Sequence, residues 1–289
     1  MMVSKILKSC AALAVSAIML TATVFADNIN NGTDWDKGVV RATGMGSYKS
    51  GAKKNLRRPQ AKRAATMDAQ RNLAEIVQGV QVTSESSMKD LELDYDIVKT
   101  RVDATIKGMT ELSSKYYEDG TCEVVLEMPI FGASKSVAEA AFLPFKDEAK
   151  EPFPQPTNVT NINVTTNVNT TVGGVVGGKY TGLVVDCSGL GLEAVMSPVV
   201  KNGNGQPIYG YKNLDIDKVI EDGMASYANS ANDAISRERA GNNPLVVRAQ
   251  KVDGTIPGNP VISVADADKV LIANQSDMFL DNCNVVFVK

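Results

Sequence analysis

Histidine is absent from the sequence, although the chain has 289 residues. This absence excludes Ser-His-Asp and Cys-His catalytic sets, histidine-ligated zinc sites and imidazole acid–base catalysis. Serine–lysine and carboxylate mechanisms remain, and each needs a positive signal of its own. The sequence pattern for nucleotide binding is not met either. Gly46–Lys54 resembles a phosphate-binding loop, but Ala52 separates Gly51 from Lys53 and no Ser or Thr follows the lysine. The sequence therefore predicts a non-catalytic protein without a cofactor or a metal.

The sequence also lacks a strong charge of either sign, with 30 basic and 33 acidic residues and a formal net charge of −3. Such a balance is ordinary for a globular protein and gives no general case for nucleic-acid binding. After residue 26, no run is apolar enough to cross a bilayer, so we expect no transmembrane segment in the rest of the chain.

Residues 1–26 have the pattern of a secretory signal peptide. A basic start precedes an apolar stretch from Ala11 to Leu20, and small residues end at Ala26. The stretch is too short to span a bilayer, so we expect cleavage after Ala26 and export to the periplasm or the cell envelope. The alternative is a lipoprotein signal at Cys10, but this cysteine precedes most of the apolar stretch instead of following it.

Cysteine is rare, and only Cys122, Cys187 and Cys283 follow the predicted leader. Cys122 alternates with apolar residues in a strand-like run, which predicts a buried thiol. In an oxidising compartment, Cys187 and Cys283 are candidates for a disulfide, since both lie at the margins of strand-like runs. The sequence contains no information on their geometry, so the bridged and free states both stay open.

Residues 36–135 have the pattern of one small α+β domain. Val39–Ala42 predicts a strand, and the glycines from Gly44 to Gly51 predict a loop. Apolar and alanine residues then recur at helical spacing, with Pro59 placed in the first turn and Gly79 at the end. Asp119-Gly120 predicts the turn of a β-hairpin.

Two features of this region are less determined. The segment from Leu91 to Val102 fits a shorter helix, although Val102, Ala104 and Ile106 also alternate as a strand would. The single tryptophan, Trp35, is expected to pack onto the domain, with an exposed contact residue as the alternative.

Residues 136–179 change composition twice and predict a linker. Four prolines between Pro144 and Pro156 indicate a stiff spacer without a packed core. Thr157–Thr171 is almost wholly Asn, Thr, Val and Ile, which favours a polar tether over a strand added to a partner.

Residues 180–289 predict a second α+β domain. Strands are expected at Leu183–Val185, Leu245–Val252, Val261–Val264 and Val285–Val288. The turn Asn202–Gly205 predicts a hairpin between Val195–Lys201 and Pro207–Tyr211. One helix is expected from Ile216 to Ile235, with Gly223 as its weak point, and Asp266 is expected to cap another short helix.

One dense basic cluster is the candidate contact surface. Cations near a helix N-terminus oppose the helix dipole, so they are not placed there to stabilise the helix. The cluster has two interpretations. It is either an ordinary solvated helix face, or a surface that contacts an anionic envelope polymer, lipid headgroups or an acidic partner. The cluster consists of Lys53, Lys54, Arg57, Arg58, Lys62 and Arg63.

Four acidic residues, Asp215, Asp217, Glu221 and Asp222, are a weaker candidate. Their spacing fits a helix start, where acids cap free N–H groups and complement the dipole. No calcium-loop pattern is present, so we do not expect a metal site here.

The first region also resembles a known family. Val40–Gly46, the helix Ala64–Gly79 and Asp119-Gly120 leading into Val124–Met128 are the segments that carry the resemblance. They are similar to LPP-type surface lipoproteins of about twenty kilodaltons and to the N-terminal domain of flagellar assembly protein T. The resemblance implies an exported, non-catalytic α+β module of envelope and flagellar accessory proteins, and it offers no catalytic residues.

Together these observations predict two small α+β domains, each an antiparallel or mixed sheet backed by helices, joined by a low-complexity tether. We expect a structural or assembly accessory of the cell surface or the flagellar base. Its expected partners are envelope or flagellar-base proteins, with self-association as a further option. The alternative function is a binding module for an anionic wall polymer or lipid surface, through the basic cluster.

Overall fold

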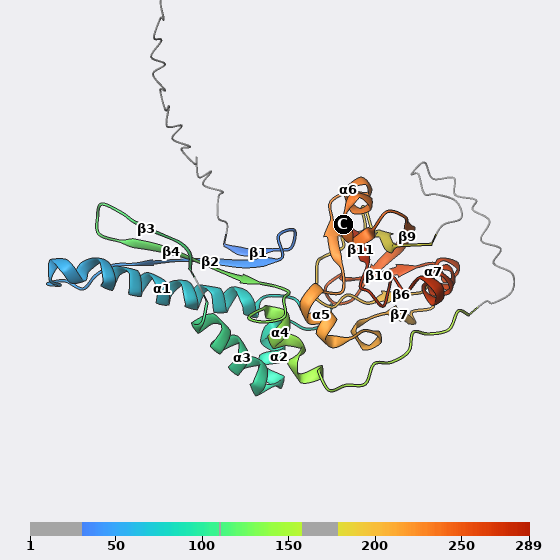
Figure 1. Ribbon diagram of the computed structural model, residues 1–289, viewed down its shortest axis with the longest axis horizontal. Coiled ribbons are helices and arrows are strands. Elements are labelled where there is room, and N and C mark those ends of the chain that lie inside the picture. The colour runs from blue at the N-terminus through green and yellow to red at the C-terminus, as the bar shows by residue number, and fades with distance from the viewer. Residues whose placement is uncertain (1–30, 110, 158–178) are drawn as a thin grey trace, which may run out of the picture.

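The computed structural model describes residues 31–109, 111–157 and 179–289, which form two β-sheets and seven α-helices (Figure 1). This confirms the predicted α+β class with two sheet-containing parts. The predicted signal peptide, residues 1–26, and the Asn/Thr/Val tract after Thr157 lie outside the described residues. Within the described ranges, no helix combines the length and apolar character that crossing a membrane requires.

The first sheet has four antiparallel strands in the order β1-β2-β4-β3. Helix α1 (Lys54–Gln78) runs along one of its faces (Figure 1). The predicted hairpin turn is confirmed, because β3 and β4 pair on either side of Asp119-Gly120 and Gly120 has a φ of +87°. The strands are β1 (Gly32–Asp34), β2 (Val39–Gly46), β3 (Glu111–Tyr116) and β4 (Cys122–Pro129).

Two glycines that predicted a loop lie in strand β2 instead. A Cβ atom on Gly44 would lie 2.0 Å from the Ala69 nitrogen, and one on Gly46 would lie 2.1 Å from the Ala65 nitrogen. The backbones of α1 and β2 therefore approach so closely that only glycine fits on the strand. The buried alanines of α1, among them Ala61, form the matching side of this contact.

The helices of the first part differ in their bounds from the predictions. α1 begins at Lys54, before Pro59, whose missing N–H removes one backbone bond at the exposed start of the helix. The segment after α1 forms two helices, α2 (Met88–Asp94) and α3 (Asp96–Lys107). The helical prediction for this segment is thus confirmed and the strand alternative is wrong.

The predicted linker begins with folded structure. Ser136 caps helix α4 (Val137–Phe142) by accepting a hydrogen bond of 3.0 Å from the Glu139 N–H, and a 3₁₀ turn η1 (Leu143–Phe145) follows. Five of the six α4 residues are buried, so this short apolar run is core and not spacer. The composition of the following proline-rich stretch concealed the boundary.

The second sheet has seven strands in the order β7-β6-β10-β9-β5-β11-β8. Neighbours among β9, β5, β11 and β8 pair in parallel, whereas β10 with β9 and β7 with β6 pair antiparallel, so the sheet is mixed as predicted. The strands are β5 (Gly182–Asp186), β6 (Val200–Lys201), β7 (Pro207–Tyr209), β8 (Ser226–Ala228), β9 (Pro244–Asp253), β10 (Asn259–Ile262) and β11 (Val285–Val288). The hairpin predicted around Asn202–Gly205 is the β6–β7 pair.

The single helix predicted from Ile216 to Ile235 is wrong. Gly223, with a φ of +72°, ends helix α5 (Ile216–Asp222), and strand β8 precedes helix α6 (Ala231–Ser236). Strand β8 pairs with β11, a partner far along the chain that local spacing does not reveal. The last helix, α7 (Val264–Asp277), is longer than predicted and is capped by Ser263 in place of Asp266. Two 3₁₀ turns complete this part, η2 (Tyr211–Asn213) and η3 (Glu238–Ala240).

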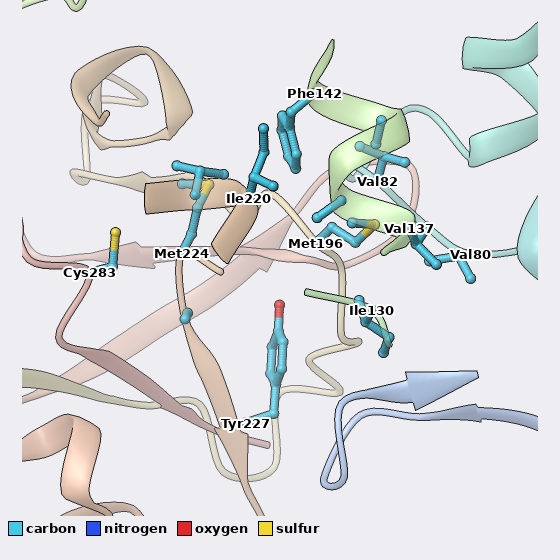
Figure 2. Packing of buried hydrophobic residues seen from close by; sticks show 14 of the residues in the cluster. Val80, Val82, Ile130, Val137, Phe142, Met196, Ile220, Met224, Tyr227 and Cys283 are labelled. Carbon is cyan, nitrogen blue, oxygen red and sulfur yellow. The ribbon is translucent and has the colours of Figure 1, made fainter. Parts of the chain in front are cut away.

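The two sheets share one hydrophobic core. Side chains from the first part, including Val82 and Phe142, belong to the same buried cluster as Met196, Ile220 and Tyr227 of the second part (Figure 2). Trp35 packs against this cluster and meets Tyr227 edge-on at 6.0 Å between ring centroids. Trp35 is therefore a packing residue, as predicted, but its ring partner belongs to the second part and not to the first domain.

Backbone hydrogen bonds also join the two parts. The segment after α1 accepts hydrogen bonds at Gln81 from Met196 (2.9 Å), at Val82 from Ser197 (2.6 Å) and at Ser84 from Ile256 (2.9 Å). The side chains of Ser84 and Asn259 form a further hydrogen bond in the buried interior. The two predicted domains are therefore in direct contact, through a common core and through these hydrogen bonds.

The candidate disulfide is not present. Cys187 and Cys283 are both free and buried, as is Cys122, whose predicted burial is confirmed. The parallel register pairs Leu183 with Val285, so Cys187 and Cys283 lie toward opposite ends of two neighbouring strands. Six residues of offset correspond to roughly 20 Å at about 3.3 Å per residue, far beyond the Cα separation that a disulfide spans.

We expect the three thiols to resist a disulfide reagent such as DTNB at pH 8 while the protein is folded. Burial raises the pKa of Cys187 to about 12 and also raises the pKa of Cys283 and Cys122. Only a small fraction of these thiols is then thiolate, the reactive form. The measurement treats residues 27–289 with the reagent in the absence of reductant, first in buffer and then in urea, and counts the cysteines that react. Three cysteines that react only in urea fit the structure, whereas a single reactive cysteine in urea reveals a bridge between the other two.

Candidate contact surface

The predicted basic cluster lies at the free end of α1, at the end of the first part away from the second sheet (Figure 1). The loop after β2 leads into the helix here, and Gly51 turns it with a φ of +81°. Lys53, Lys54, Arg57 and Arg58 are exposed. The helix N-cap, Lys53, makes no side-chain capping bond and the first turn contains no acid, so no local partner offsets these charges.

Two arginines of the cluster lie over tyrosine rings from other elements. The Arg57 guanidinium is 5.1 Å from the Tyr48 ring centroid, and its Nε donates to the Ala52 carbonyl at 3.2 Å. The Arg58 guanidinium is 5.1 Å from the ring of Tyr116, which ends strand β3. Stacking fixes the plane of each guanidinium while leaving N–H groups at its edge for an anion.

The structure does not bring all six residues together. Lys62 is half-buried and donates to Glu111 Oε1 at 2.6 Å, a contact that raises the pKa of Lys62. Arg63 follows the buried Ala61 by two residues, about 200° around the helix, and faces away from the sheet. The contact surface therefore consists of the remaining four cations.

The sequence missed three neighbours of this surface. Tyr48 and Tyr116 supply the aromatic rings, and Lys49 adds an exposed cation in the same loop. Tyr116 comes from a strand that lies far along the chain, so only the fold shows that it belongs here. We call Lys49, Lys53, Lys54, Arg57 and Arg58, with Tyr48 and Tyr116, the basic tip.

The acidic residues at α5 have local capping and ion-pair partners. Asp215 caps the helix by accepting from the Asp217 N–H at 2.9 Å. Asp217 pairs with Lys146 at 2.8 Å, and Asp222 pairs with Lys218 at 2.6 Å. Across the described ranges, no group of three or more Cys, Asp or Glu side chains is placed to hold a metal.

Part of the chain matches a known protein family. Residues 182–289 match a family model described as the second domain of Treponema pallidum Tp0624. The matched segment is the second sheet with its helices, from β5 to β11. No curated protein is significantly similar to the chain. The match lies outside the segments that resemble the LPP-type lipoproteins, so that resemblance stays a prediction.

Proposed function

We propose that this chain is a non-catalytic exported protein of the cell envelope, an assembly or structural accessory that attaches through its basic tip to an anionic wall polymer. The observation that carries this proposal is the pair of arginines fixed over tyrosine rings at one exposed end of the molecule. Each guanidinium over a ring keeps N–H groups at its edge for an anion.

Charge at the basic tip favours a polyanion over a compact anionic ligand. Residues 46–58 contain five cations and no acid, although the chain as a whole has a net charge of −3. The cations lie on an exposed loop and helix end, and a repeating anion could contact several of them at once. Their attraction to such a polymer should weaken with salt, because exposed charges are screened.

The sequence supports the location and the class. The leader pattern of residues 1–26 predicts export, and the resemblance of the first region to LPP-type lipoproteins and to flagellar assembly protein T favours an accessory of the surface or the flagellar base. The shared core supports a structural role, since it holds the basic tip in a fixed position relative to the second sheet.

We expect a quadruple Gln variant of Lys53, Lys54, Arg57 and Arg58 to bind a polyanion at least about tenfold more weakly at about 50 mM salt. The probe is fluorescently labelled polyphosphate, and anisotropy with residues 27–289 measures the affinity. Each removed charge weakens the attraction, and the loss should shrink as salt is added.

The matched control removes four charges elsewhere, in a quadruple Gln variant of exposed lysines. If the control loses as much affinity as the tip variant, net charge explains binding and the basic tip is not the contact surface. Absence of binding by the unmodified chain would also contradict the proposal. The control positions are Lys89, Lys99, Lys107 and Lys251.

A further inference from the structure

A cavity of about 330 Å³ opens between the two parts, on the side of Trp35. Thr33 lines it from β1 and Trp35 from the β1–β2 connection, and Gly79–Gln81 line it from the segment directly after α1. The second part contributes Leu192–Ala194 and Lys289. Neither part forms the cavity alone, and we call it the Trp35 cavity.

The walls of the Trp35 cavity are held by contacts behind them. The Trp35 ring meets Tyr227 edge-on, and the Tyr227 hydroxyl donates to the Val195 carbonyl at 2.8 Å and accepts from the Val195 N–H at 3.0 Å. The Gln81 carbonyl accepts from the Met196 N–H at 2.9 Å. The cavity is therefore formed before any ligand arrives, which reduces the entropy that binding must offset.

Four polar residues are among those that line this cavity; Thr33 and Gln81 are half-buried, and Glu193 and Lys289 are exposed. Thr33, Gln81, Glu193 and Lys289 make no side-chain hydrogen bond or ion pair with any other residue in the described ranges. Together they offer an acceptor, a donor and two groups that do both. A hollow lined by apolar surface and by a few polar groups that the fold does not use has the composition of a ligand site.

The chemistry of the lining selects the ligand class. Trp35 and Leu192 supply apolar surface, and the four polar side chains supply hydrogen bonds of both directions. The volume lies at the lower end of roughly 300–1,000 Å³ for small-molecule sites, which suits one or two sugar rings and excludes a folded peptide. A sugar ring presents an apolar C–H face and a rim of hydroxyl groups, which matches this combination.

We propose that the Trp35 cavity binds a small saccharide, with a ring face packed on Trp35 and hydroxyl groups bonded to Gln81 and Glu193. This site is separate from the basic tip and from the function proposed for it. A saccharide unit of an envelope glycan is the natural source of such a ligand, and the balance of one cation and one acid in the lining favours a neutral or weakly charged sugar.

The experiment uses the protein's own reporter. Trp35 is the single tryptophan of the chain, so its fluorescence reports on this cavity alone. N,N′-diacetylchitobiose is titrated into residues 27–289 up to about 10 mM, a range that covers the weak binding expected of so small a site. We expect a saturable change in Trp35 emission.

Variants that keep Trp35 locate the binding. Glu193→Gln and Gln81→Ala should each weaken affinity about two- to tenfold, the loss of one hydrogen bond, because both side chains line the cavity. Glu238→Gln changes an exposed acid outside it and should leave affinity unchanged. Circular dichroism verifies that each variant is folded.

Three outcomes would overturn the proposal. The first is no change in emission up to the highest concentration. The second is an affinity of the Glu193 and Gln81 variants for the disaccharide that equals the affinity of the unmodified protein. The third is a saturable response to glycylglycine with none to the disaccharide, which would assign the cavity to a zwitterionic peptide end. Loss of polyanion binding in the basic-tip variant leaves sugar binding unaffected, so the two proposals fail independently.

Discussion

Replacing Gly44 with alanine is expected to lower the free energy of unfolding by about 3 kcal/mol or more, near or above the upper end of ordinary overpacking. The added methyl would lie 2.0 Å from the Ala69 nitrogen and 2.4 Å from the Ala65 carbonyl oxygen. Both atoms belong to the backbone of α1, so no side-chain rotation relieves the contact. The helix would have to move away from β2 and lose part of the packing between them.

Unfolding in guanidinium chloride, followed by far-UV circular dichroism, measures this effect. Gly210→Ala is the matched control, because its added methyl would meet only Val199 Cγ2, at 3.7 Å, an ordinary contact. Gly210 has an extended φ of −172°, which any residue adopts. Equal midpoints for the two variants would show that α1 and β2 do not approach as closely as the structure has them.

The same glycines show where sequence reasoning ends. The α1 stripe of Ala61, Ala65 and Ala69 and the hairpin turn at Asp119-Gly120 depend on neighbours in the chain, and both were predicted. The sequence predicts a loop at Gly44 and Gly46, because glycine usually interrupts strands. A run of alanines on the facing helix was the available signal for close packing, but no local rule connects the two segments.

Longer-range pairings explain the other differences. Tyr227 fits the helical spacing of its neighbours, yet strand β8 forms because β11 lies beside it. The sequence allows a bridge between Cys187 and Cys283, and the parallel register of β5 and β11 separates them. In both cases the deciding partner lies tens of residues away.

For the candidate contact surface too, some features follow from the sequence and others only from the fold. Its cations were visible as a charge run, whereas the rings that order them belong to Tyr48 in the loop and Tyr116 in β3. Lys62 belongs to the predicted basic cluster by its position in the chain, but in the fold it donates a hydrogen bond to Glu111 of β3. Sequence thus predicts the charge of this surface, and the fold selects which charges remain available.

Phe142→Ala is the second large effect, with an expected loss of about 3–5 kcal/mol of unfolding free energy. Phe142 is 2% exposed and lies on α4, inside the segment whose composition predicted a linker. Its ring lies beside Ile220 of α5 in the core that both sheets share (Figure 2). A linker residue would tolerate the change, whereas this one leaves a cavity between the two parts.

The shared core also predicts how the variant unfolds. Trp35 fluorescence reports on the junction of the two parts and circular dichroism on the whole chain, so their denaturant transitions should coincide before and after the substitution. Leu93→Ala, at a side chain 75% exposed, is the control and should stay within about 0.5 kcal/mol. Separate transitions, or a Phe142 variant as stable as the Leu93 variant, would mean that the two sheets fold independently. In that case the basic tip would have no fixed position relative to the second sheet, and the Trp35 cavity would lose one of its walls.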